Sequence, residues 1–412
     1  MQAADLSWTG MVYDICIVGA GLWGSSAARH ASLPGRKVCL IGPSEPQEKD
    51  RPSRDIFASH YDVSRTVRKY QGSDHIRSLM TMRAYKGLQE LERTTGIQLN
   101  AAVGHIMYGK DIESITVPIA KEEGVLLTAE GVRERYPYLD TSRYGDTAML
   151  LPVDAGHANP RMIVRAQQEA AALRGCDIID DVVQSVEESG NHTHGEPLMR
   201  VVIEKGRPLL AKKVLLCTGA FTQLKNLLPP STKLDFGIDG TFTVRLEVGE
   251  DDLEKISSMP TMTSFTDPES NCYMLPPIKY PDGKYYVKLG PGYQDQRRLT
   301  SLKEVKDWFL SKPDPKLVEK YRDLLLSIVK GFNPMSVKTD MCVCSRTPTG
   351  LPYCDMVSSK VGLAIGGNGF GAMLSDEVGR MAAEMIAGGE NWNRDIPREM
   401  LKAQFITPPS NL

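Results

Sequence analysis

The sequence has no excess of either charge. Lys and Arg total 49 and Asp and Glu total 51, which gives a net charge of −2. A phosphate backbone needs a broad cationic surface, and this composition does not predict one. We therefore expect no nucleic-acid partner.

The first ten residues, MQAADLSWTG, lack both a basic stretch and a long apolar stretch. Neither a signal peptide nor a membrane anchor is predicted, so synthesis in the cytosol is expected. At the other end, residues 410–412 read Ser-Asn-Leu, which differs from the peroxisomal address Ser-Lys-Leu only by Asn for Lys. We expect a peroxisomal or a cytoplasmic protein, and a frayed polar tail is the alternative interpretation of these residues.

The sequence also lacks histidines and cysteines at the spacing typical of metal sites. The seven histidines show no such spacing, and the eight cysteines are scattered except in MCVCSRTPTGLPYCD at 341–355. That cluster offers Cys342, Cys344 and Cys354 with no histidine close by, so we expect no metal. A disulfide between Cys342 and Cys344 is disfavoured by geometry and by a reducing compartment. A reactive thiol and simple packing remain possible for the cluster.

The length of 412 residues predicts two or three structural units, with no internal repeat. The first strong pattern is an apolar run from Ile15 to Val18, then Gly19-Ala-Gly21-Leu-Trp-Gly24, a helix-like stretch of small residues, and a second apolar run. Strand, tight turn, helix and strand is the context in which this glycine spacing binds a dinucleotide. Gly19 permits the turn, Gly21 admits a pyrophosphate, and Gly24 lets the helix pack on the strand.

One part of this fingerprint is missing. An acidic residue normally ends the second strand and binds the ribose, but Gly42 stands there, followed by Pro43, Ser44 and Glu45. Ser44 or Glu45 could take that role, or neither.

A second glycine-rich loop, Gly366 to Gly371, lies between a strand pattern and a helix pattern near the other end of the chain. A further buried strand, Val214 to Cys217, closes on Thr218-Gly219. Backbone N–H groups of such loops can bind an anion or an electron-rich ring. Two loops at opposite ends of the chain predict one long cofactor that spans both.

The chain resembles the sarcosine oxidase branch of the D-amino acid oxidase-like flavoproteins over nearly its full length. The resemblance is carried by VGAGLWG at 18–24, ASHYDVSRTVRKY at 58–70, VKLGPG at 287–292, the cysteine cluster and IGGNGFG at 365–371. It implies FAD and an α/β (α+β) fold, in which a Rossmann-type FAD-binding domain carries a substrate domain built on a large mixed β-sheet. The FAD-binding domain is expected at 11–99, 155–230 and 335–400, the substrate domain at 100–154 and 231–334, and a tail at 401–412.

The resemblance also implies roles for single residues. Ser64 and Arg65 are expected beside the flavin ring, Arg68 on the substrate carboxylate, and Lys288 at the ring, where it promotes reaction with oxygen. Further cofactor contacts are expected from Val183, Gly219, Gly367, Asn368, Gly369, Phe370 and Gly371. Cys342, thirteen residues before Asp355, is expected to form a thioether to the flavin, with an inert buried thiol as the alternative.

Two positions depart from the family pattern. Gly371 stands where a lysine shares the substrate carboxylate, and Gly292 stands where a histidine follows the oxygen-activating lysine. The substrate is therefore expected to be larger than sarcosine, or to be held elsewhere, for example by Tyr273, Met274 or Tyr280.

We therefore predict an FAD-dependent oxidase, expected to be monomeric, of a secondary amine or N-substituted amino acid. Hydride transfer to FAD, imine hydrolysis and reoxidation by O2 would yield hydrogen peroxide. One alternative is a dehydrogenase of the same fold that passes electrons to a carrier or quinone. Another is a non-catalytic flavin-bound protein, which the glycines at 42, 292 and 371 favour.

Overall fold

The computed structural model describes residues 11–71, 74–109, 124–193, 195–229, 232–267, 269–389, 392 and 395–407. The Ser-Asn-Leu of the C-terminus lies outside these ranges, so the peroxisomal address stays a prediction. In this part of the chain, no helix is both long and apolar enough to cross a membrane.

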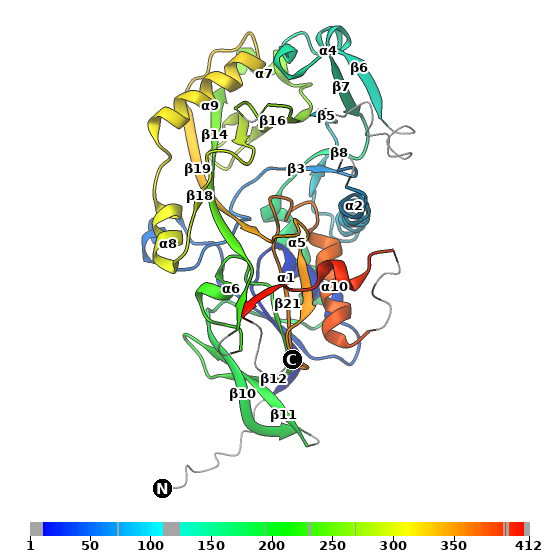
Figure 1. Ribbon diagram of the computed structural model, residues 1–412, viewed down its shortest axis with the longest axis vertical. Coiled ribbons are helices and arrows are strands. Elements are labelled where there is room, and N and C mark those ends of the chain that lie inside the picture. Colours follow the sequence, from blue (N-terminus) through cyan, green and yellow to red (C-terminus); the bar gives the residue numbers. More distant parts are fainter. Residues whose placement is uncertain are drawn as a thin grey trace.

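An eight-stranded sheet forms the lower half of the molecule in Figure 1. Five strands, in the order β9-β2-β1-β12-β21, run parallel. Their near-continuous apolar runs, such as VCLI in β2, are typical of strands buried on both faces. The strands of this sheet are β1 (Val12–Val18), β2 (Val38–Ile41), β9 (Asp177–Ile179), β10 (Val183–Thr193), β11 (Glu196–Ile203), β12 (Leu209–Leu216), β20 (Tyr353–Met356) and β21 (Val361–Ile365).

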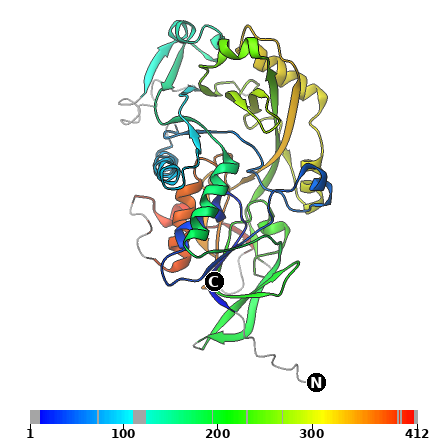
Figure 2. The same cartoon turned by 180° about the vertical axis from the view of Figure 1, so that it is seen from behind.

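Four helices gather beside this sheet: α1 (Leu22–Ala31), α2 (His75–Thr95), α5 (Pro160–Leu173) and α10 (Ser375–Ala387). Helix α1 contacts both α5 and α10, and α2 contacts the same two helices, as the view from behind in Figure 2 shows. The helix ends follow from sequence: Asn159 caps α5 before Pro160, and Gly96 ends α2 in the left-handed conformation.

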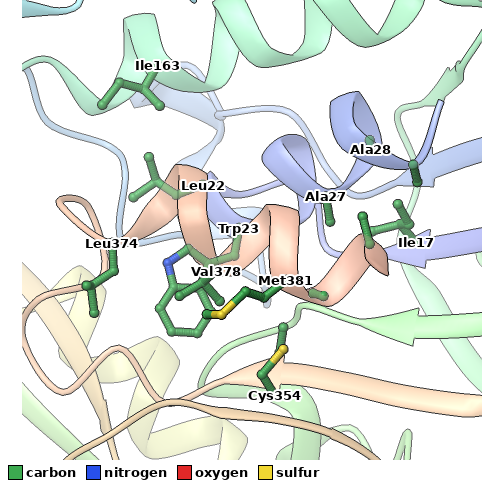
Figure 3. Packing of buried hydrophobic residues seen from close by; sticks show 14 of the residues in the cluster. Ile17, Leu22, Trp23, Ala27, Ala28, Ile163, Cys354, Leu374, Val378 and Met381 are labelled. Carbon is green, nitrogen blue, oxygen red and sulfur yellow. The ribbon is translucent and has the colours of Figure 1, made fainter. Parts of the chain in front are cut away.

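Figure 3 shows the core between these helices and the sheet, where Trp23 of α1 packs near Val378 and Met381 of α10. The two helices approach closely because small residues face each other. A Cβ added to Gly379 would lie 2.2 Å from the Ser26 hydroxyl oxygen. The helix that follows the first glycine-rich loop is therefore fixed against the helix that follows the second.

A nine-stranded mixed sheet forms the upper half of the molecule in Figure 1. Among the residues that the structure describes, β5 and β15 are the one parallel pair of this sheet. Helix α9 (Pro315–Ile328) contacts β14 and β17, and α7 (Glu250–Ile256) and α4 (Ala129–Arg135) contact other strands of the sheet. The strands are β5 (His105–Gly109), β6 (Val125–Thr128), β7 (Thr147–Leu151), β14 (Gly237–Val248), β15 (Thr261–Phe265), β16 (Cys272–Lys279), β17 (Tyr285–Pro291), β18 (Arg297–Arg298) and β19 (Val337–Arg346).

A three-stranded sheet of β3 (Arg65–Arg68), β8 (Ala155–Ala158) and β4 (Asn100–Ala101) lies between the two large sheets in Figure 1. It brings the segment with the predicted site arginines to the junction. The remaining elements are β13 (Lys233–Leu234), β22 (Phe405–Thr407), α6 (Phe221–Leu224), α8 (Leu302–Leu310), and the 3-10 helices at Glu48–Ser53, Ser142–Tyr144 and Arg398–Leu401.

The two large sheets match the predicted division into a Rossmann-type unit and a unit with a large mixed sheet. The domain limits themselves stay predictions. One predicted segment is shared: residues 335–400 were assigned to the FAD-binding domain, but β19 pairs with β14 of the nine-stranded sheet from Val337 to Arg346. The chain then continues into β20 and β21 of the other sheet.

Candidate active site

The glycines of the first loop differ in their surroundings. Gly19 has φ 106°, and a Cβ there would lie 2.5 Å from the carbonyl oxygen of Cys217. At Gly24 a Cβ would lie 1.9 Å from the carbonyl oxygen of Gly19, so this glycine lets α1 pack against the turn. Gly21 faces open space, with His60 Nδ1 the nearest atom to its added Cβ, at 3.9 Å. Because no side chain caps α1, its first N–H groups remain available to an anion.

Gly42 is explained by packing. A Cβ at this position would lie 2.4 Å from the backbone nitrogen of Ala20, so an acidic side chain has no room there. Ser44 is engaged by Asp180, with its N–H donating at 2.9 Å and its hydroxyl at 2.7 Å, and Glu45 pairs with Arg161. The ribose role predicted for Ser44 stays a prediction, and this geometry does not favour it.

A cavity of about 1150 Å³ opens over this loop. It collects loops that follow β1, β2, β12 and β21, which is where ligands bind in open parallel sheets. The predicted residues in its wall are Gly19, Gly21, Val183, Gly219, Gly367 and Gly371.

A second cavity of about 1210 Å³ adjoins the first, and the two share Leu22, Ser59, Val343, Ser345, Gly367 and Gly371. It lies where the three-stranded sheet and the nine-stranded sheet meet the second glycine-rich loop. The predicted residues in its wall are Arg65, Arg68, Cys342, Gly367, Asn368, Gly369, Phe370 and Gly371. The structure thus brings together residues from both ends of the chain.

The two connected cavities fit FAD. Several buried polar atoms in their walls have no hydrogen-bond partner: Nδ1 of His60 in the first cavity, and the hydroxyls of Thr66 and Thr243 in the second. Burial lowers the pKa of His60 to about 4, so its ring is neutral and can serve a ligand as donor or acceptor. A long ligand with phosphates at α1 and a ring system near Arg65 would supply partners to these atoms.

Lys288 and Ser64 line neither cavity. The Lys288 ammonium is buried and donates to the hydroxyl of Ser64 at 2.7 Å and to Asp62 Oδ2 at 2.8 Å. Asp62 also pairs with Arg65, which does line the second cavity. The predicted pair of Arg65 and Lys288 is therefore joined by a carboxylate that the sequence analysis missed. A lysine expected inside a buried strand requires a counter-charge, and Asp62, two residues before Ser64, could have been named on that ground.

Arg68 is a buried cation without a carboxylate partner in the described part of the chain. Its side chain lines the second cavity, and Nε donates to the carbonyl oxygen of Tyr70 at 3.1 Å. Burial lowers the pKa of Arg68 to about 10, opposed by Tyr293 and assisted by Arg77. The guanidinium stays charged at neutral pH, and its two terminal nitrogens can bind an anion.

All eight cysteines are free. Cys342 and Cys344 both lie in the wall of the second cavity, whereas Cys354 packs in the hydrophobic core. Burial raises the pKa of Cys342, and the Arg65 charge opposes that shift. No group of three or more His, Cys, Asp or Glu side chains suited to a metal occurs within the described ranges.

The mouth of the second cavity carries two exposed aromatic rings. Phe265 and Tyr293 stack with their ring centroids 6.1 Å apart, and the Arg346 guanidinium lies 4.8 Å from the Tyr293 ring. Of the alternative substrate contacts predicted, Tyr273 lines this cavity, but Met274 is in the core and Tyr280 donates to Asp62.

Comparison with known proteins agrees with this geometry. Residues 14–385 match the DAO family, described as FAD dependent oxidoreductase. The chain is 29% identical to monomeric sarcosine oxidase of Streptomyces avermitilis over 40% of this chain and 42% of that protein. It is 24% identical to a probable sarcosine oxidase of Arabidopsis thaliana, and the match covers 92% of this chain and 89% of that protein. For N-methyl-L-tryptophan oxidase of Yersinia pestis the identity is 25%, and the match covers 53% of this chain and 56% of that protein. The matched region thus spans about half of the Streptomyces and Yersinia proteins.

Solved structures share the fold. NikD, an unusual amino acid oxidase essential for nikkomycin biosynthesis, superposes with a TM-score of 0.76 at 16% identity, over 98% of this chain and all of NikD. L-proline dehydrogenase from P. horikoshii gives a TM-score of 0.71 at 18% identity, and the superposition covers 95% of this chain and 96% of the dehydrogenase. The family match over most of the chain, together with two joined cavities that suit FAD, shows that this protein belongs to the DAO family of FAD-dependent oxidoreductases.

Proposed function

We propose that the protein is an FAD-dependent oxidase of a secondary amine or N-substituted amino acid that bears a carboxylate. The observation that supports this most directly is Arg68, a buried guanidinium that has no carboxylate partner among the described residues and lines the cavity next to the phosphate loop. A buried cation is costly unless it meets an anion. A substrate carboxylate is such an anion.

Arg68 would hold the substrate in one orientation. Its Nε is engaged by Tyr70, so the carboxylate binds at the two terminal nitrogens through parallel hydrogen bonds. Two parallel hydrogen bonds would fix the direction of the neighbouring carbon–hydrogen bond relative to the cofactor ring. The reacting groups would then be held in the orientation that the reaction requires.

FAD held by the two glycine-rich loops would supply the redox chemistry, which is transfer of a hydride equivalent from the amine and of two electrons to oxygen, and the products would be hydrogen peroxide and an imine that hydrolyses. The chain supplies positive charge nearby. Arg65 lies in the cavity wall, and Lys288 is tied to it through Asp62. Fixed cations stabilise negative charge that develops during the reaction with oxygen, because they need no reorganisation at that moment.

The aromatic mouth favours a substrate larger than sarcosine. Phe265 and Tyr293 are 39% and 55% exposed, so their rings can cover an apolar substituent that projects outward from Arg68. The relatives named for sarcosine and for N-methyl-L-tryptophan span this range of substituent sizes.

The experiment is anaerobic mixing of the FAD-loaded protein with N-methyl, cyclic and glycated amino acids and with the amide of each. Loss of the oxidised flavin absorbance with an amino acid, and a much weaker response to its amide, is expected. Arg68→Met should abolish that difference, while Arg143→Met, a control outside both cavities, should preserve it. If an amino acid and its amide reduce the flavin equally well, the proposal that the substrate binds through a carboxylate is wrong.

The second candidate is a dehydrogenase that passes electrons to a carrier protein or quinone. The observation that favours it is that Lys288 is held by Asp62 and Ser64 and does not line the cavity. Peroxide formed in stoichiometric amounts under air distinguishes the oxidase. Reduction by amine without reoxidation by air supports the dehydrogenase.

A further inference from the structure

Asp62 is a buried carboxylate that receives hydrogen bonds from several elements. Lys288 of β17 donates to Oδ2 at 2.8 Å, the hydroxyl of Tyr280, which follows β16, donates to Oδ1 at 3.0 Å, and the N–H of Val63 donates to Oδ1 at 2.7 Å. Arg65 at the start of β3 completes the set. The side chain is 7% exposed, and each of its oxygens has at least two partners.

Four titratable groups from three segments of the chain lie around Lys288. Asp62 and Arg65 lie before and within β3, Asp340 on β19, and His157 on β8. Burial lowers the pKa of His157 to about 4, so that ring adds no positive charge at neutral pH. Asp340 pairs with Arg245 at 2.7 Å, which leaves Asp62 as the carboxylate in contact with the lysine.

We propose that Asp62 is a positioning residue that keeps the Lys288 ammonium charged and fixed beside Arg65. This inference rests on the proposed function, in which Lys288 serves the reaction with oxygen. Asp62 acts through Lys288 and Arg65 and does not itself line the cavity.

The physical reason is the balance between burial and pairing. Burial lowers the pKa of Lys288 to about 8 even with Asp62 in place, and Asp62 is the strongest opposing influence. Without that carboxylate the lysine would lose its proton near neutral pH, since a buried amine is favoured as the neutral form. The flexible lysine stem would also lose its strongest anchor.

The first measurement does not depend on catalysis. In protein labelled with ¹³Cε-lysine, the Lys288 resonance, assigned by its loss in Lys288→Met, is titrated against pH. Asp62→Asn should lower the titration midpoint by about 1–3 pH units. Asp340→Asn is the matched control, because Asp340 influences Lys288 without touching it, and a smaller shift is expected there. An unchanged midpoint in Asp62→Asn, or an equal shift in both variants, would overturn the proposal.

The second measurement is the rate at which reduced protein reacts with oxygen from pH 6 to pH 9. In Asp62→Asn the rate should fall at a lower pH than in the wild type, by the same number of pH units as the Lys288 titration midpoint, so the difference in rate from the wild type should shrink as the pH approaches 6. A purely structural defect would lower the rate equally at every pH and would contradict the proposal.

If Asp62→Asn does not fold, Asp62→Glu provides the test. It retains the charge but moves the carboxylate, so the Lys288 titration should stay close to the wild-type midpoint while the oxygen reaction slows. A wild-type rate in Asp62→Glu would refute the positioning role. Failure of the proposed function has a different signature: Lys288→Met would then react with oxygen as fast as the wild type, whereas the titration result for Asp62 would be unaffected.

Discussion

Nη2 of Arg29 in α1 lies 2.5 Å from Oδ1 of Asp376, and both side chains are nearly inaccessible to solvent, with exposures of 8% and 5%. Gln167 of α5 donates to the same carboxylate oxygen at 2.7 Å. One carboxylate thus joins three helices, two of which follow the glycine-rich loops. Positions 29 and 376 are as distant in sequence as the loops themselves.

Asp376→Asn should lower the free energy of unfolding by about 3–5 kcal/mol, because it leaves the Arg29 charge buried without a counter-charge. Denaturant unfolding followed by circular dichroism measures this loss. Asp307→Asn is the control, since Asp307 pairs with Lys303 on an exposed helix face, where water screens the charges and a much smaller loss is expected. Similar losses in both variants would show that the Arg29 pair adds nothing beyond a surface pair.

The same carboxylate predicts an acid dependence of stability. Burial alone would raise the pKa of Asp376, but His30, Arg29 and Gln167 outweigh it and hold the pKa well below its usual 3.8. A carboxyl whose pKa is depressed by folding contributes stability above the unfolded pKa and loses it as pH falls further. The difference in unfolding free energy between wild type and Asp376→Asn should therefore be constant from neutral pH to about pH 4 and shrink below it. A difference that grows with acidity would contradict the assignment.

Gly21→Leu should give folded protein that does not retain FAD. A Cβ at this position would meet no protein atom closer than His60 Nδ1 at 3.9 Å, so we expect the variant to fold, and the rest of the leucine side chain would occupy the space over the loop. Gly190→Leu is the matched control, because its position in β10 is also open and lies outside both cavities. The ratio of flavin to protein absorbance, measured beside a circular dichroism spectrum, checks both. A fully loaded Gly21→Leu protein would place the pyrophosphate elsewhere.

Cys342 is predicted to bind FAD covalently. A thioether between Sγ of Cys342 and the 8α carbon would replace the S–H bond and one methyl C–H bond, and the two electrons released would pass to oxygen. Acid precipitation should leave the pellet yellow in the wild type and in Cys344→Ser, and colourless in Cys342→Ser. Colour in the wild-type supernatant would refute the tether, and a colourless pellet only in Cys344→Ser would transfer it to that neighbour, which lines the same cavity.

Lys288→Met should leave anaerobic reduction by the amine near the wild-type rate and slow reoxidation by oxygen by roughly two orders of magnitude. Only the reaction with oxygen develops negative charge near the ammonium. Stopped-flow absorbance separates the two half-reactions. Equal slowing of both would make Lys288 a structural or substrate-positioning residue.

The sequence was most informative where one residue type has one physical use. Gly19 and Gly24 stand where a Cβ would strike backbone atoms, and the apolar runs of β1 and β2 suit only strands covered on both faces. Such local constraints predicted the dinucleotide-binding unit and both loops, whereas the large mixed sheet was expected only from the family resemblance. Contacts over long sequence separations were not predictable in this way. Nothing near Gly42 in the sequence indicates that it packs on Ala20, and nothing within residues 337–346 indicates that this strand pairs with β14.

Asp62 illustrates the limit at the site. Its carboxylate lies 226 residues from Lys288 in sequence, and a single acidic residue in a polar loop is ordinarily solvated. The need of a buried Lys288 for a counter-charge could be inferred from the sequence, but the contact that makes Asp62 this counter-charge is seen only where β17 meets the segment that leads into β3. Tyr280 was named as a possible substrate contact because its partner in the fold was not evident from the sequence. In the structure its hydroxyl donates to Asp62.

The late position of β21 in the chain affects when the cofactor site can form during translation. Strand β21 lies beside β12, and the loop that follows it completes the wall of the cofactor cavity. During translation the first glycine-rich loop leaves the ribosome long before this wall exists, so a nascent chain can form its early strands but has no complete site to offer FAD. Until β21 is made, β12 is paired with β11 from Leu209 to Ala211, but its edge from Val214 to Leu216 lacks a partner, and such an edge can pair with other chains. Capture of the cofactor is therefore a late event in the life of each molecule, and the product of a premature stop before residue 361 would be colourless and prone to aggregate.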